Sequence, residues 1–233
     1  ALFWNNHDQP RALNRFVDVE NFRNEGATML AASIHLSRGT PYIYMGEEIG
    51  MVDPDYDSME DYVDVESLNA YQTLLAEGQS PEAAFRIIKA KSRDNSRTPM
   101  QWDDSVNAGF TTGTPWLKAG KSYPLINVEN EIKGPIFTFY QKLIALRKEL
   151  PIIAEGSYQP AYEDSPQVYA FEREWQGQKL LVLNNFYADP ITVDILPDYQ
   201  NGQVLLSNYG KNQIDHVMTL QPYETLAILV GEN

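Results

Sequence analysis

The sequence predicts two structural classes in one chain, an α/β part followed by an all-β part. The α/β prediction rests on a strand–helix–strand order, with short apolar strands at 1–6 and 42–45 and a helix over 20–38 between them. The all-β prediction rests on a change of period after Pro151, where short apolar segments begin to alternate with turn residues. A polar loop follows each of the first two strands, so the first part has the order of a βαβ unit with a right-handed connection.

The helix over 20–38 is predicted from apolar residues at helical spacing and from its stop signal. Glu20 lies near its start, Arg38 lies in its last turn, and Gly39 with Pro41 follows directly. The apolar positions are Phe22, Ala27, Leu30, Ala31 and Ile34.

A long insertion of mixed character is predicted over 50–134. It holds one helix around 67–77 and a second that begins at Ser80 and Pro81, a capping residue followed by proline at the first helical position. The segment 91–102 has too many charges and turn formers for a regular element, so we interpret it as an ordered functional loop.

An amphipathic helix over 136–150 ends at Pro151, where we place the domain boundary between residues 1–150 and 151–233. The second domain is predicted to be a small antiparallel β-sandwich, because its segments are rich in Val, Ile, Tyr and Leu and are separated by pairs such as Gln176-Gly177. The predicted strands are 157–162, 167–175, 179–186, 191–196, 203–208, 216–220 and 224–230.

Composition excludes some classes of function. The 233 residues carry a formal charge of −14, which argues against general nucleic-acid binding, because that function needs a basic face. Cysteine is absent, so disulfides and thiolate chemistry are excluded, and a reducing, cytoplasmic location is expected. No apolar run is long enough for a bilayer, and the abrupt apolar start without a leader is expected for the middle of a larger protein.

The run Asn6-His7-Asp8, followed by Arg11, is the first candidate site. It lies where an apolar strand ends, and the catalytic groups of α/β barrels gather at the C-terminal ends of strands. The alternative is a helix entry, in which Asp8 caps a helix and Arg11 pairs with a nearby acid.

Three long motifs in order resemble the C-terminal part of α-glucosidases of the α-amylase superfamily, glycoside hydrolase family 13. The resemblance covers essentially the whole chain, and within the family it is nearest to trehalose-6-phosphate hydrolases, with oligo-1,6-glucosidases as the alternative. Met45 stands where many relatives carry Gln. The motifs are 3–11 (FWNNHDQPR), 39–51 (GTPYIYMGEEIGM) and 93–102 (RDNSRTPMQW), and the subfamily indications are 63–69, 91–96 and 141–148.

The resemblance implies a fold. The strands at 1–6 and 42–45 would be the seventh and eighth of a (β/α)8 TIM barrel, with 20–38 as the seventh helix. The insertion would cover the catalytic face, the helix at 136–150 would close the barrel, and an antiparallel β-sandwich domain would follow.

The resemblance also implies a retaining glycosidase mechanism, in which one carboxylate attacks the anomeric carbon and a second carboxyl group protonates the leaving oxygen. Asp8 matches a third carboxylate, which stabilises the oxocarbenium-like transition state. His7 and Arg93 match sugar contacts, while Arg11 would either contribute to substrate binding by orienting Asp8 or brace the loop. For Arg93 the alternative is a loop salt bridge, with Asp94 or Asp103 as the partner.

Other polar and aromatic residues are expected to be structural. Glu47 and Glu48 resemble a paired-acid site, yet hydrogen bonding within the fold is the better interpretation, and the mid-helix His35 is likewise expected to be structural. The aromatic residues of the insertion would stack on sugars or, more commonly, pack against the protein. These aromatic residues are Trp102, Phe110 and Trp116.

The resemblance assigns neither the nucleophile nor the general acid to this chain, so the 233 residues alone are expected to be inactive. Exposed barrel edges predict self-association. No cofactor and no metal are expected, and the expected partner is a small sugar substrate. Three hypotheses remain: a trehalose-6-phosphate hydrolase, an oligo-1,6-glucosidase, and a non-catalytic carbohydrate-binding module.

Overall fold

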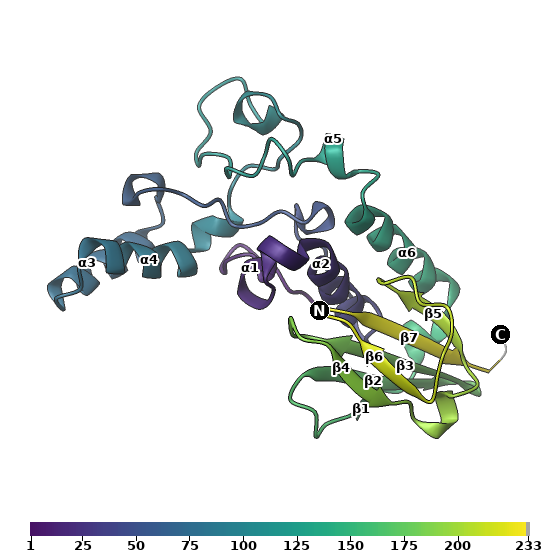
Figure 1. Ribbon diagram of the computed structural model, residues 1–233. Helices are drawn as coiled ribbons and strands as arrows, with labels where there is room; N and C mark the ends of the chain where they lie inside the picture. The colour runs from purple at the N-terminus through teal and green to yellow at the C-terminus, as the bar shows by residue number, and fades with distance from the viewer. Residues whose placement is uncertain (232–233) are drawn as a thin grey trace. The chain divides into compact units, whose positions relative to one another are not determined.

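The computed structural model describes residues 1–231, which form two compact units (Figure 1). The sheet unit consists of 1–3, 16–42 and 135–231, and the loop unit consists of 4–15 and 43–134. The predicted α/β plus all-β class is confirmed. The predicted domain boundary near Pro151 stays a prediction, because the compact units group residues by contact rather than by position along the chain.

In the sheet unit, a five-stranded antiparallel sheet in the order β1-β2-β3-β7-β5 faces a two-stranded sheet of β4 and β6. Helices α2 and α6 pack on one another, and α2 contacts β3 and β7. The elements are α2 (Val19–His35), α6 (Pro135–Glu149), α7 (Pro151–Glu155), β1 (Gln159–Ala161), β2 (Val168–Trp175), β3 (Gln178–Asn185), β4 (Ile191–Asp194), η5 (Pro197–Tyr199), β5 (Gln203–Ser207), β6 (Val217–Leu220) and β7 (Thr225–Val230).

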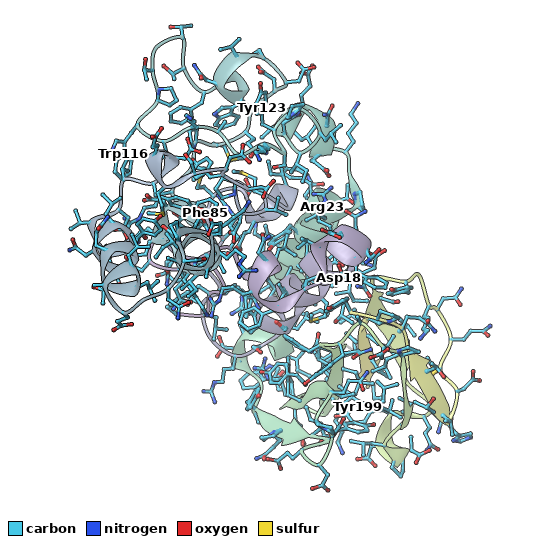
Figure 2. The ribbon with its side chains drawn as sticks, turned by 60° about the vertical axis from the view of Figure 1, so that its left-hand side comes forward. Asp18, Arg23, Phe85, Trp116, Tyr123 and Tyr199 are labelled. Carbon is cyan, nitrogen blue, oxygen red and sulfur yellow. The ribbon has the colours of Figure 1, made fainter. Side chains whose placement is uncertain are left out.

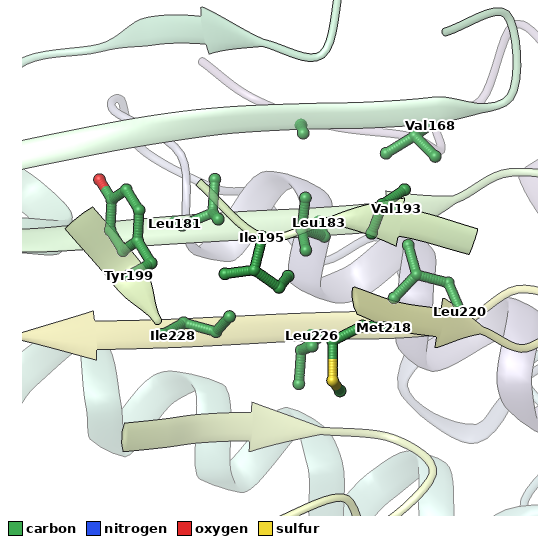
Figure 3. Close-up of a cluster of buried hydrophobic side chains, with 11 residues drawn as sticks. Val168, Leu181, Leu183, Val193, Ile195, Tyr199, Met218, Leu220, Leu226 and Ile228 are labelled. Carbon is green, nitrogen blue, oxygen red and sulfur yellow. The ribbon is translucent and has the colours of Figure 1, made fainter. Parts of the chain in front are cut away.

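The core of the C-terminal segments lies between the two sheets. Leu181 and Leu183 of β3 belong to one buried cluster with Val193 of β4 and Leu220 of β6, and all four side chains are buried (Figure 3). The intervening residues of β3 are also fully buried, so both faces of this central strand are covered. The predicted β-sandwich and all seven of its strands are present, with ends shifted by a few residues.

The loop unit is built from short helices and irregular segments. Helices α3 and α4 pack together, and Tyr56 and Tyr62 form a small buried cluster with Ile88 of α4. The elements are α1 (Ala12–Phe16, whose last residue belongs to the sheet unit), η1 (Glu47–Ile49), η2 (Met59–Asp61), α3 (Val65–Ala76), α4 (Pro81–Lys91), η3 (Arg93–Ser96), η4 (Val106–Gly109) and α5 (Val128–Glu131).

The strands predicted at 1–6 and 42–45 are reduced to one parallel bridge between Leu2 and Pro41. The Leu2 amide donates to the Thr40 carbonyl and the Tyr42 amide donates to the Leu2 carbonyl, both at 2.8 Å. A regular strand needs a continuous series of backbone hydrogen bonds to a neighbouring strand. Within residues 1–231, these two runs are joined by a single residue pair. Helix α2 lies between the two runs as predicted, but the two regular strands were predicted wrongly.

Helix boundaries follow the local capping signals. Helix α4 begins as predicted, with the Ser80 side chain accepting a hydrogen bond from the Ala83 amide at 3.2 Å. Pro151 ends α6, as predicted, but it also begins α7, because proline is pre-organised for the first position of a helix. None of the helices within residues 1–231 combines the length and the apolar character that a membrane crossing requires.

Candidate active site

Asp8 lies in the irregular segment of the loop unit before α1, and its carboxylate is open to solvent. Its side chain is 52% exposed. Oδ1 accepts a hydrogen bond from Arg97 Nη2 at 3.2 Å and lies 3.6 Å from Arg93 Nη1, while Oδ2 lies 3.3 Å from His7 Nε2. The Asp8 amide donates to Asn6 Oδ1 at 2.8 Å, which shapes the turn. The structure therefore brings the predicted residues Asp8, His7 and Arg93 together.

Arg93 begins the short helix η3 and is partly exposed. Within residues 1–231 its ion pairs are with Asp64, Glu66 and Asp8 rather than with Asp94 or Asp103. The hydrogen bond to Asp64 raises the pKa of the Arg93 guanidinium, so the side chain stays charged. The suggested loop salt bridge exists with different partners, and one of them is the candidate catalytic carboxylate itself.

Asp64 anchors this group of charges from inside the fold. It is the N-cap of α3 and accepts hydrogen bonds from the Ser67 amide at 3.1 Å and the Ser67 hydroxyl at 3.0 Å, while its side chain is 3% exposed. Burial opposes ionisation of Asp64, but the hydrogen bonds from Arg93 and Ser67 outweigh it and lower the pKa of the carboxyl group. A buried, charged anchor is therefore fixed at the start of α3.

Arg97 is the residue that the sequence reasoning missed. Its Nε donates to the His7 carbonyl at 2.7 Å and its Nη2 donates to Asp8, and Nη1 lies 3.6 Å from Asp64 Oδ1. Arg97 also stands in the 93–102 motif, four positions after Arg93. That repeated arginine in an irregular charged loop was the available signal.

Arg11 is 1% exposed and makes no hydrogen bond to Asp8 in the described chain. Its Nη1 donates to the Met45 carbonyl at 2.8 Å, its amide donates to Asp53 Oδ1 at 2.9 Å, and its guanidinium lies 5.8 Å from the centre of the Tyr44 ring. This placement matches the bracing interpretation. The role of Arg11 in substrate binding stays a prediction, because none of its contacts described above involves Asp8.

Of the paired acids Glu47 and Glu48, Glu47 behaves as part of the scaffold. Glu47 is 6% exposed and accepts a hydrogen bond from Asn5 Nδ2 at 2.6 Å, and burial raises its pKa to about 7. Burial also raises the pKa of the nearby Asp53 to about 6, against hydrogen bonds from Arg11 and Asn95. The donors Asn5 and Arg11 belong to the segment 4–15 that also carries Asp8, so Glu47 has the structural role that was expected.

The other sequence candidates divide. His35 is buried in α2, where Nδ1 bonds to the Ala31 carbonyl at 2.9 Å and the ring meets Tyr140 edge-on, so it is structural. Trp102, Phe110 and Trp116, by contrast, are exposed, and the preferred packing role was wrong for these three residues. Trp116 is 70% exposed and lies among the irregular segments that follow α4, the helix that carries Phe85 (Figure 2). Trp102 and Phe110 are each 49% exposed. No group of three or more metal-ligating side chains occurs within residues 1–231.

Comparison with known sequences identifies curated relatives of two kinds. The chain is 45% identical over 239 residues to the oligo-1,6-glucosidase of Halalkalibacterium halodurans, and 45% identical over 232 residues to the trehalose-6-phosphate hydrolase of Bacillus subtilis. The matches cover 100% and 97% of this chain, but 42% and 41% of those proteins. The chain thus spans about two-fifths of the length of the curated relatives it matches.

Solved structures give the same result. The trehalose-6-phosphate hydrolase TreA of Bacillus licheniformis superposes with a TM-score of 0.94 at 44% identity, over 99% of this chain and 43% of that one. The trehalulose synthase MutB of Pseudomonas mesoacidophila superposes with a TM-score of 0.90 at 35% identity, over 99% and 43%.

Family models cover both parts of the chain. The alpha-amylase catalytic domain matches residues 1–156, and the alpha-amylase SusG C-terminal domain matches residues 168–226. Together with the accessible carboxylate at Asp8 and the fold that carries it, these matches show that the chain belongs to the alpha-amylase family of glycoside hydrolases.

Proposed function

We propose that the protein containing this chain hydrolyses an α-glucosidic bond with retention of configuration, and that Asp8 stabilises the transition state. The observation that carries the proposal is the Asp8 carboxylate, half exposed and bordered by His7, Arg93 and Arg97. A carboxylate that is held in place but open to solvent can face a ligand, whereas a sealed carboxylate cannot.

Cleavage of a glycosidic bond requires an accessible, fixed carboxylate of this kind. As the glycosidic bond breaks, positive charge develops at the anomeric carbon and ring oxygen, and a fixed anion nearby lowers the energy of that state. His7 and Arg93 offer donors beside Asp8, since their side chains are 69% and 32% exposed, and these donors suit sugar hydroxyls. The proposal assigns no nucleophile and no general acid to the 233 residues.

For the substrate we propose trehalose 6-phosphate, cleaved to glucose and glucose 6-phosphate in the cytoplasm. The support is the similarity to trehalose-6-phosphate hydrolases in sequence and in solved structure. The alternative substrate class is isomalto-oligosaccharides, because an oligo-1,6-glucosidase is 45% identical as well.

Substitution of Asp8 tests the mechanism in the intact protein that carries these residues. Asp8→Asn keeps the shape of the side chain but removes its charge, so we expect kcat to fall by about 10²–10³-fold. Asp57→Asn is the matched control, because Asp57 is a 78% exposed carboxylate of the same unit. A kcat unchanged by Asp8→Asn removes Asp8 from the mechanism and overturns the proposal.

A comparison of kcat/KM for trehalose 6-phosphate and isomaltose tests the substrate. We expect preference for the phosphorylated disaccharide, and a preference for isomaltose establishes the oligo-1,6-glucosidase alternative. Sugar binding without turnover of either substrate by the intact protein favours a non-catalytic carbohydrate-binding module. The 233-residue chain assayed alone is expected to show no turnover.

A further inference from the structure

We propose that Arg97 is a positioning residue, which fixes the His7–Asp8 segment against the N-terminus of α3. The inference rests on the proposed function of Asp8 and adds the group that holds Asp8 in its working orientation. The resemblance and the comparisons assign no role to Arg97.

Each nitrogen of the Arg97 guanidinium has a separate contact. Nε donates to the backbone carbonyl of His7 at 2.7 Å, and Nη2 donates to Asp8 Oδ1 at 3.2 Å. Nη1 lies 3.6 Å from Asp64 Oδ1 and 3.9 Å from Asp94 Oδ1. One planar group therefore contacts both the backbone and the carboxylate of the segment that carries the candidate catalytic residue.

Asp64, which Arg97 contacts at the N-terminus of α3, is held firmly by hydrogen bonds. Asp64 caps α3 through Ser67, and its own amide donates to Asp94 Oδ2 at 2.9 Å, as does the Val63 amide at 2.8 Å. The side chain of Asp94 is fully buried. Arg97 thus connects an exposed loop to buried groups that cannot move without opening the fold around α3.

The residue before Arg97 and the Arg97 amide itself are also held by hydrogen bonds. The Ser96 hydroxyl donates to the Gln9 carbonyl, and the Tyr44 hydroxyl donates to the Ser96 carbonyl at 3.0 Å. The Arg97 amide donates to the Asp94 carbonyl at 3.0 Å. The loop 93–97 and the segment 7–9 are therefore joined at three successive positions of the latter, through His7, Asp8 and Gln9.

Exposure separates the roles of the two arginines. Arg97 is 19% exposed and donates hydrogen bonds to the His7–Asp8 segment, whereas Arg93 is 32% exposed and lies 3.6 Å from Asp8 Oδ1. We therefore assign Arg93 to the substrate and Arg97 to Asp8. Lysine cannot replace Arg97 fully, because its single ammonium cannot keep three contacts in a fixed plane.

The test uses Arg97→Ala and Arg97→Lys in the intact protein, with Arg86→Ala as the matched control, since Arg86 is an exposed arginine on α4. Misplacement of a reacting group by about 1 Å costs on the order of 10²-fold in rate, so we expect Arg97→Ala to lower kcat by about 10²-fold with little change in KM. Arg97→Lys should retain part of the rate, and added guanidinium should restore part of the rate of Arg97→Ala but not that of Asp8→Asn.

Several outcomes overturn the inference while leaving the proposed function intact. These are a normal kcat for Arg97→Ala beside an inactive Asp8→Asn, or a raised KM with normal kcat, which marks a substrate contact. A normal kcat for Asp8→Asn overturns the proposed function instead. If Arg97→Ala does not fold, Arg97→Lys decides, and an undiminished kcat in that variant overturns the inference.

A double-mutant cycle with Asp64→Asn locates the anchor. If Arg97 acts through Asp64, the two substitutions together should lower kcat by less than the product of their separate effects. Multiplicative effects would show that Asp64 and Arg97 act independently, and would overturn the assignment of α3 as the fixed end.

Discussion

Arg173 in the sheet unit and Arg97 in the loop unit are both surrounded by oxygen atoms, but the oxygens differ in kind. Arg173 is fully buried, and within residues 1–231 it donates to backbone carbonyls, those of Leu36, Ile153, Gly156 and Ser157. Arg97 is partly exposed and divides its contacts between one carbonyl and three carboxylates. The first arginine satisfies neutral groups in the scaffold, and the second places a charge where a ligand can reach it.

The difference teaches how a structural arginine can be told from a functional one in this fold. Carbonyl partners are fixed by the backbone, so an arginine among them contributes only to stability. Among the carboxylate partners of Arg97, Asp8 is half-exposed and keeps a charge that can act on a third group. Removing each kind of contact should therefore affect a different measurement, stability for Arg173 and turnover for Arg97.

The largest effect on stability is expected for Arg173→Ala. The substitution leaves several buried carbonyls without donors and opens a cavity, so the free energy of unfolding should fall by about 3–5 kcal/mol. Urea unfolding of the purified protein measures it, with Lys142→Ala on the exposed side of α6 as the control. A loss no larger than that of the control would mean that the buried guanidinium contributes nothing net.

Glu47→Gln is expected to change the free energy of unfolding by less than Arg173→Ala does, and the change should depend on pH. Burial raises the pKa of Glu47 from 4.5 to about 7, so the folded protein binds more protons than the unfolded protein in that window. The free energy of unfolding therefore falls as pH rises from 4.5 to 7, by on the order of 3 kcal/mol for this group. Gln stays neutral, so the variant should unfold at higher urea than the wild type at pH 8 and at similar urea near pH 4.5.

The control for Glu47→Gln is Glu60→Gln, at an exposed position of the same unit. The slope of stability against pH should be flatter in Glu47→Gln than in this control. Identical slopes in the two variants would show that ionisation of Glu47 at neutral pH does not lower the stability of the folded protein.

The smallest effects compare one glycine from each unit. Gly46 has φ +88°, and a Cβ there would lie 2.3 Å from Met51 Sδ and 3.2 Å from Arg11 Nη1, whereas Gly177 has φ +87° with nothing within 4 Å. Gly177→Ala should cost about 1 kcal/mol from backbone strain alone. Gly46→Ala should cost about 2 kcal/mol, because a clash with buried atoms is added. Equal urea midpoints for the two variants would show that the turn at Gly46 accommodates a Cβ without a further loss of stability.

The regular elements followed from the sequence because their signals are local. The apolar spacing of 136–150 and the strand segments after Pro151 predicted α6 and the seven strands within a few residues, since helical and strand periods are set by neighbours in the chain. The strands at 1–6 and 42–45 failed, because a strand exists only when a partner edge is present, and an apolar run does not show its partner.

In the candidate site, too, some features could be predicted from the sequence and others could not. Motif resemblance singled out Asp8, His7 and Arg93, and the residue types alone stated what chemistry they could support. Only the tertiary structure decided that Asp8 is open, that Arg11 is sealed, and that Arg97 meets Asp8 across 89 positions of sequence. Contacts at that separation depend on how the chain returns to itself, and no local pattern in the sequence records that path.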